Sequence, residues 1–342
     1  MRIGFCCKMM SPTGDAAEDK RCNVTTTTLA ALRRLDRDGA RQKLSAIMET
    51  NLGALRRQVD YVAGQPPLER ALRISSDMFP AYGHPLGEWF YKDPGVRRRI
   101  ADELASIGDC ARRHDLRLSL HPGQFCVINS VEPATLDNAV KELEYHADIM
   151  RWLGYGEGWH PGGAHINIHG GSRAGGVQNF RAGMARLSAT ARSLLTVEND
   201  EVSFGLDDLL PLAEDLPIVV DLHHHWIKSG GEYLQPEDPR LEVVRASWRG
   251  VRPMAHVSVS REDLLVGHPA DSLPDLPTLA ARGIKPRDLR AHSDRMWNNA
   301  VNDLVLAHLS WADFEVEAKH KNLAVDDLAR HIGRRLAVAP AA

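Results

Sequence analysis

The stretch HINIHGGSRAGGVQNFRAGMARLSATARSLLTVE, residues 165–198, contains the unit that decides the fold. It opens with a strand-like run at 165–169, turns at a pair of glycines, and continues with helical spacing over 177–192. A second strand-like run follows at 194–198. This order is typical of parallel sheets, in which a helix connects successive strands. Both runs end in a residue that can bind a metal, His169 and Glu198.

The same unit recurs along the whole chain. We expect eight strands, at residues 2–5, 71–75, 117–121, 165–169, 194–198, 217–221, 253–259 and 314–317. Stretches of helical period separate them, and a long irregular stretch at 267–295 precedes the last helical pair. This alternation predicts an α/β fold, a TIM (β/α)8 barrel. We expect one domain over residues 1–336 and a flexible tail over 337–342.

Composition limits the function classes. The length of 342 residues suits a single large barrel, and the net charge of −3 argues against a molecule that is basic over its whole surface. Five cysteines without framework spacing favour reduced thiols and a cytoplasmic setting. We see no signal peptide, and no apolar run approaches the roughly 20 residues that span a bilayer. No obligate protein partner is evident.

Six of the expected strands have, at their carboxyl end, a residue whose side chain can bind a metal. Because the carboxyl ends of parallel barrel strands meet at one mouth, these side chains predict a common metal site there. A further candidate, His224, follows the sixth strand in the run DLHH. We place His160, His165, His223 and His225 outside this site. The six strand-end residues are His121, His169, Glu198, Asp221, His256 and Glu317.

Each candidate taken alone has a plainer interpretation. Asp221 could cap a helix, Glu198 could belong to a solvated acidic loop, and Glu317 could pair with Lys319 or another base. A lone strand histidine is more often a packed, hydrogen-bonded residue than a ligand. The shared position at one end of the barrel is what packing alone would not arrange. Imidazole and carboxylate ligands without thiolates suit Mn, Zn, Fe or Mg, and their number implies two or three divalent ions.

The order of several segments resembles the UV damage endonucleases, which are related in fold to endonuclease IV. The resemblance extends over nearly the whole chain. It implies an enzyme that binds double-stranded DNA carrying UV lesions. Such enzymes cut the backbone immediately 5′ to a cyclobutane pyrimidine dimer or a 6-4 photoproduct and leave a 3′-hydroxyl and a 5′-phosphate. The segments are RISSDMFP, LSLHPGQF, HINIHGG, LTVEND, VVDLHHHW, HVSVSRED and FEVEAKHK.

Carried over to this chain, the resemblance implies ions that are usually manganese, with magnesium or zinc as alternatives. Among the ligands, it implies catalytic roles for Glu198, Asp221 and Glu317. The implied ligands are His84, His121, His169, Glu198, Asp221, His224, His256, His292 and Glu317.

The resemblance also implies residues that probe the distorted duplex, namely Phe5, Gln124 and Phe125. The family pattern has tyrosines where this chain has the two phenylalanines. A phenyl ring keeps the planar apolar body that a wedge in a base stack needs, but it lacks the hydroxyl group. The pattern also has a lysine where this chain has Met254, two residues before His256. Methionine cannot replace the amine chemically.

Three rival functions are compatible with the same barrel. The first is an apurinic-site endonuclease or another metal-dependent hydrolase. The second is a sugar isomerase with two ions at the mouth, which would need a closed pocket and not an open groove. The third is a non-catalytic relative that binds damaged DNA, for which Met254 is the motivating observation.

Overall fold

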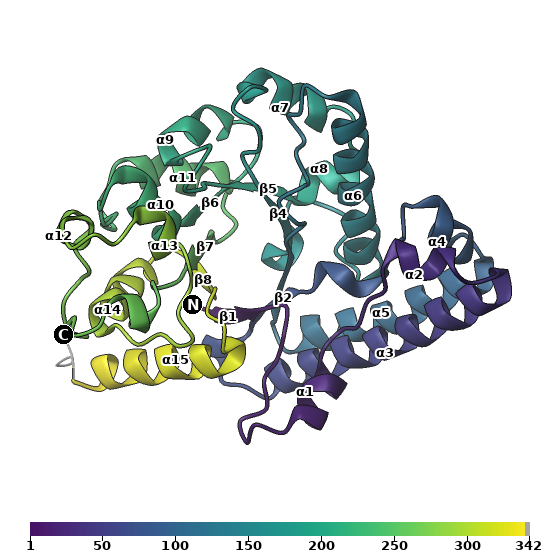
Figure 1. Cartoon of the computed structure of the whole chain (residues 1–342), viewed down its shortest axis with the longest axis horizontal. Coiled ribbons are helices and arrows are strands. Elements are labelled where there is room, and N and C mark those ends of the chain that lie inside the picture. Colours follow the sequence, from purple (N-terminus) through teal and green to yellow (C-terminus); the bar gives the residue numbers. More distant parts are fainter. Residues whose placement is uncertain (339–342) are drawn as a thin grey trace.

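The computed structural model describes residues 1–338 and contains a closed barrel of eight parallel strands in sequence order (Figure 1). The expected fold is therefore confirmed, and each strand lies within two residues of its expected bounds. The strands are β1 (Ile3–Cys6), β2 (Ala71–Ile74), β3 (Arg117–Leu120), β4 (His165–His169), β5 (Leu195–Glu198), β6 (Ile218–Asp221), β7 (Met254–Val257) and β8 (Asp313–Val316).

Helices surround the barrel, and the longest, α3, packs beside α5 (Figure 1). Outward-facing strand side chains such as Val197 and Phe314 form the main apolar core. The helices are α1 (Ala16–Cys22), α2 (Leu29–Arg33), α3 (Arg37–Ala63), α4 (Pro85–Tyr91), α5 (Pro94–Arg113), α6 (Pro133–Trp152), α7 (Gly176–Met184), α8 (Ala189–Leu194), α9 (Leu206–Leu209), α10 (Leu222–Ser229), α11 (Arg240–Ser247), α12 (Leu276–Ala281), α13 (Pro286–Leu289), α14 (Asn299–His308) and α15 (Lys321–Val338). Short 3-10 helices are η1 (Pro67–Glu69), η2 (Ser76–Met78), η3 (Pro161–Gly163), η4 (Leu210–Leu212) and η5 (Glu262–Leu264).

Two expectations about local structure were wrong. The single helix expected over 177–192 is divided into α7 and α8, because the Ser188 side chain accepts a hydrogen bond from the Ala191 amide and starts a new helix. The stretch 267–295 is not wholly irregular, since it contains α12 and α13. Residues 337 and 338 belong to α15, and the rest of the expected tail, 339–342, lies outside the described residues.

The inside of the barrel is unusually polar. Near the amino ends of the strands, Arg117 of β3 pairs with Asp313 of β8 at 3.1 Å. Closer to the mouth, Arg73 of β2 pairs with Glu315 of β8 at 2.6 Å. Barrel interiors are ordinarily filled with branched apolar side chains, so these buried charges need a specific reason. Within residues 1–338, no helix is long and apolar enough to cross a membrane.

Candidate metal centre

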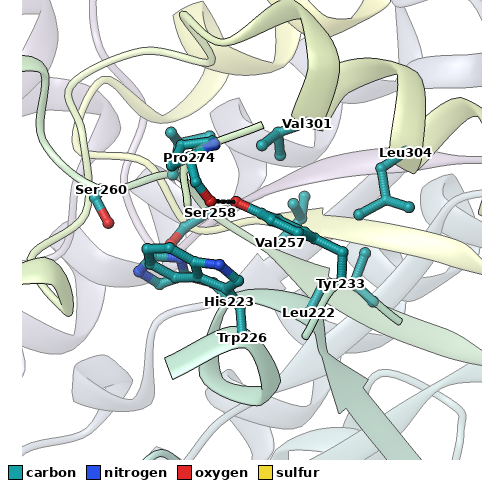
Figure 2. A pocket seen from close by; sticks show the side chains of 11 residues that line it. Leu222, His223, Trp226, Tyr233, Val257, Ser258, Ser260, Pro274, Val301 and Leu304 are labelled. Atoms are coloured by element: carbon teal, nitrogen blue, oxygen red, sulfur yellow. Dashed lines mark hydrogen bonds between the residues drawn. The ribbon is translucent and has the colours of Figure 1, made fainter. Parts of the chain in front are cut away.

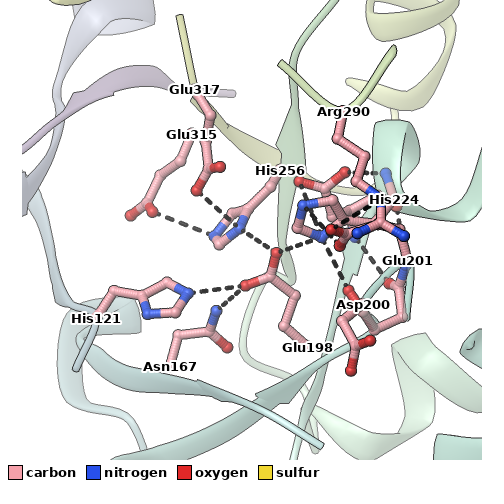
Figure 3. A network of polar contacts seen from close by, with 12 residues as sticks. His121, Asn167, Glu198, Asp200, Glu201, His224, His256, Arg290, Glu315 and Glu317 are labelled. Carbon is pink, nitrogen blue, oxygen red and sulfur yellow. Dashed lines mark hydrogen bonds and ion pairs between the residues drawn. The ribbon is translucent and has the colours of Figure 1, made fainter. Parts of the chain in front are cut away.

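Glu198, the last residue of β5, lies at the middle of the mouth (Figure 3). Its carboxylate is fully buried, so it is not part of a solvated acidic loop. Oε2 accepts a hydrogen bond from Asn167 Nδ2 and lies 3.1 Å from His121 Nε2. Oε1 lies 3.0 Å from His256 Nδ1 and 3.4 Å from His224 Nδ1. One carboxylate therefore connects ligand-type side chains from both halves of the barrel.

Eight of the nine expected ligands gather into three groups, in each of which the candidate ligand atoms lie within 4.8 Å of one another. Glu198 belongs to two of the groups and can bridge them. The spacing is compatible with several ions that share ligands. The groups are His121 with His169 and Glu198, Glu198 with Asp221 and His256, and His224 with His292 and Glu317.

Asp221 caps a helix and also lies in one of the candidate ligand groups. It ends β6 and caps α10, because its Oδ1 accepts a hydrogen bond from the His224 amide at 2.7 Å. Its other oxygen, Oδ2, is buried and has no hydrogen-bond partner among the described residues. Burial raises the pKa of this carboxyl. A buried carboxylate oxygen left in this way needs either a proton or a cation.

The histidine hydrogen bonds show which ring nitrogens are available. His121 Nδ1 lies 2.9 Å from the Pro122 carbonyl, and His224 Nδ1 lies 3.1 Å from the Asn199 carbonyl. A carbonyl only accepts, so each Nδ1 carries the proton and a neutral ring has its lone pair on Nε2. Metal-binding histidines are usually oriented by this kind of contact. The His121 lone pair then faces the Glu198 oxygen, which is repulsive unless a cation or a proton lies between them.

The buried carboxylates at the mouth also need compensating positive charge. Burial opposes charge on Glu198, but His256 and His169 hold its pKa well below the usual range. Burial also opposes charge on His256, but the Glu198 carboxylate raises the pKa of this histidine to about 10. The protein alone therefore balances its carboxylates with protonated imidazoles. Divalent ions would supply that charge instead, and the nitrogen and oxygen donors suit manganese, magnesium or zinc. The residues present fit such ions.

His292 reaches the mouth from the segment that follows β7. The Leu289 carbonyl accepts hydrogen bonds from Ser260 Oγ at 2.7 Å and His223 Nε2 at 3.0 Å, and the Ser293 amide donates to Val259 at 2.8 Å. These bonds tie the end of α13 to the barrel.

Figure 2 shows His223 and Trp226 of α10 among the side chains that line a cavity of about 20 Å³. A space of that size holds no more than about one water molecule, so it is a packing void and not a substrate pocket.

Two buried charged residues that our sequence analysis missed lie beside the ligands. Arg73 Nε lies 2.6 Å from Glu315 Oε2, and Arg73 Nη1 lies 2.5 Å from Glu317 Oε1. Glu315 Oε2 also lies 3.2 Å from His256 Nε2 (Figure 3). Glu317 therefore pairs with Arg73, whereas Lys319 pairs with Asp294. The available signal was charge within two short strands, Arg73 in ALRI and both Asp313 and Glu315 in DFEV.

A groove of about 610 Å³ opens from this cluster. His169, His224 and Glu317 line it at the cluster, and Gln124 and Val202 line it on the loops that follow β3 and β5. Phe125 is 68% exposed on the same loop as Gln124. The ligand groups are thus reached from an open surface.

A sequence profile described as UV-endonuclease UvdE matches residues 1–339. The chain belongs to the UvdE family. The UV-damage endonuclease of Schizosaccharomyces pombe is 31% identical over 76% of this chain and 40% of its own length. The UV-damage endonuclease of Neurospora crassa is 30% identical over 76% of this chain and 37% of its own length. The chain thus spans about two fifths of these fungal relatives.

A bacterial relative and a solved structure match over more of their length. The UV DNA damage endonuclease of Bacillus velezensis is 27% identical over 95% of this chain and 91% of its own length. The crystal structure of SacUVDE has a TM-score of 0.75 at 24% identity and covers 98% of this chain and 99% of its own. This likeness supports the barrel fold.

Three residues that the resemblance to the UvdE family singled out do not lie in the candidate metal centre or the groove. His84 lies outside the three ligand groups, and its Nδ1 caps α4 by accepting from the Leu86 amide at 3.1 Å. Phe5 is 2% exposed and packs on Tyr61, so the expected probing role is not compatible with its position in the apolar core. Met254 is fully buried with Trp248 in a small apolar cluster. Arg73, and not a residue of β7, is the cation beside His256.

Proposed function

We propose that this protein is a metal-dependent DNA repair endonuclease that cuts the backbone immediately 5′ to UV photoproducts and leaves a 3′-hydroxyl and a 5′-phosphate. The observation that carries the proposal is the position of Glu198, a buried carboxylate shared by two ligand groups at the end of an open groove. The family membership and the names of the relatives support the same activity.

The chain's own residues have distinct parts in this reaction. Glu198, Asp221 and Glu317 would hold two or three divalent ions, together with the histidines of the three groups. When bound, such ions activate water and stabilise the charge that develops on the phosphate and the departing 3′-oxygen. Gln124 and Phe125 would probe the distorted duplex, which is supported by Gln124 lining the groove and by the exposure of the Phe125 ring. A damaged dinucleotide unstacks at lower cost than intact DNA, which is a physical basis for selectivity.

An end-labelled duplex with one photoproduct tests the proposal. We expect a single nick 5′ to the lesion with Mn²⁺ and none with a chelator, and ligation should detect the 3′-hydroxyl and 5′-phosphate. An intact duplex and a duplex with an apurinic site are assayed in parallel as controls. Cleavage of the apurinic duplex alone would favour the apurinic-site endonuclease. Binding without cleavage under any metal would favour the non-catalytic relative, and neither binding nor cleavage would leave only a small-molecule enzyme.

A further inference from the structure

The groove beside the cluster is lined mainly by acids, polar groups and histidines. Asp200 and Glu201 of the loop after β5 lie along it, together with Glu317. A DNA phosphate that enters such a groove meets strong repulsion unless positive charge compensates it. Among the described residues that line the groove, Arg290 carries the single arginine or lysine charge.

The backbone around Arg290 is held firmly over the mouth. Arg290 follows α13 and directly succeeds the fully buried Leu289, whose carbonyl accepts two hydrogen bonds from the barrel side. One residue further on, the Ala291 carbonyl accepts from the Arg261 amide at 3.2 Å. A residue whose backbone is ordered before the substrate arrives loses less entropy on binding.

The guanidinium of Arg290 is incompletely paired. Its Nε lies 3.6 Å from Glu201 Oε1, which is beyond good hydrogen-bond distance, and this nitrogen is buried without a hydrogen-bond partner in the described chain. Glu201 faces both Arg290 and His224, since its other carboxylate oxygen lies 3.7 Å from His224 Nε2 (Figure 3). A partly exposed ion pair of this length contributes little to stability, so a structural role alone does not account for the arrangement.

We propose that Arg290 binds a backbone phosphate of the DNA that occupies the groove, and that Glu201 is the resting partner it leaves. This inference rests on the proposed function, because it takes duplex DNA as the ligand. A guanidinium presents several N–H groups in one plane and can donate two parallel bonds to a phosphate, which Glu201 does not receive at 3.6 Å. Arg290 would then hold the strand beside the cluster without reading its sequence.

The test measures binding of the full chain to irradiated and intact duplexes in EDTA, so that no strand is cut, over a range of salt concentrations. Losing one phosphate contact should make the slope of log affinity against log salt less steep by about 1. We expect this change in Arg290→Gln, with an affinity loss of roughly tenfold for both duplexes, since bonds to charged groups are strong. Arg290→Lys should keep most of the slope but bind more weakly.

Arg287→Gln is the matched control, because Arg287 lies three residues earlier, is 70% exposed, and does not line the groove. It should leave the slope unchanged. Equal effects of the two glutamine variants would overturn the proposal, since any surface charge would then suffice. An unchanged slope in Arg290→Gln, with normal wild-type binding, would overturn this inference alone. A wild type that binds neither duplex, in EDTA or with Mn²⁺, would overturn the proposed function as well.

Discussion

Arg73 Nη1 lies 2.5 Å from Glu317 Oε1, so a fixed cation from β2 holds a candidate metal ligand of the chain segment after β8. The same guanidinium holds Glu315, and its Nη2 lies 2.9 Å from His256 Nε2. The other Glu317 oxygen, Oε2, faces His292 at 3.9 Å. Arg73 thereby leaves one oxygen of the carboxylate directed toward the ligand group that contains His292.

Removing Arg73 should expose its charge-balancing role. Arg73→Met leaves two buried carboxylates without their partner, and such a loss typically costs about 3–5 kcal/mol. Divalent ions supply positive charge to the same place, so Mn²⁺ should stabilise this variant more than it stabilises wild type. Denaturant unfolding with Mn²⁺ and with EDTA measures the difference. Arg117→Met, at the other end of the barrel, should be destabilised without recovery by metal. Equal metal effects in wild type and Arg73→Met would contradict this assignment.

Glu198→Gln should remove the bridge between two ligand groups. Glutamine keeps the shape but loses the charge, and we expect Mn²⁺ affinity to fall by roughly 100-fold or more, because even partners outside the ligand sphere contribute 10–100-fold. Titration calorimetry and metal content measure the change, and nicking should fall with it. Glu69→Gln, in η1 before β2 and thus at the opposite end of the barrel, is the control. Unchanged metal content in Glu198→Gln would place the ions elsewhere.

Replacing Gln124 and Phe125 with alanine should lower the preference for damaged DNA. Base–aromatic stacking is worth about 1–3 kcal/mol per base, so the ratio of irradiated to intact duplex affinity should fall by roughly tenfold. Metal content should not change. Val131→Ala removes another exposed apolar side chain, 56% exposed, and should have no effect on the ratio. A ratio that survives the double substitution would mean that the lesion is recognised elsewhere in the groove.

Glu69 should make stability fall as pH rises. Burial, helped by the nearby Asp326 charge, raises its pKa from 4.5 to about 7. The folded state therefore binds this proton more tightly than the unfolded chain, so the stabilisation is present below pH 4.5 and is lost as pH increases through 7. Glu69→Gln stays neutral and should be more stable than wild type at pH 8 but similar at pH 4. Urea unfolding at both values checks this, with exposed Glu242→Gln as the control.

The sequence determined the barrel and the end of it at which the candidate ligands lie. Strand-like and helical periods alternate from β1 to α15, and parallel strands joined by helices bring all their carboxyl ends to one face. A ligand type at the end of a strand therefore lies at the mouth whatever the details of packing. His121, Glu198 and Asp221 are far apart in the chain, and their side chains lie in two groups that share Glu198, whereas metal binding by them stays a prediction.

Tertiary structure alone decided the partners and the orientation of side chains. Arg73 meets Glu317 because closing the barrel places β1 between β2 and β8, and strand periods do not reveal contacts across its interior. His292 reaches the cluster through hydrogen bonds made by a long segment with no regular period. Phe5 turned outward because successive strand residues face opposite sides, and the register of a four-residue strand is fixed only by its neighbours.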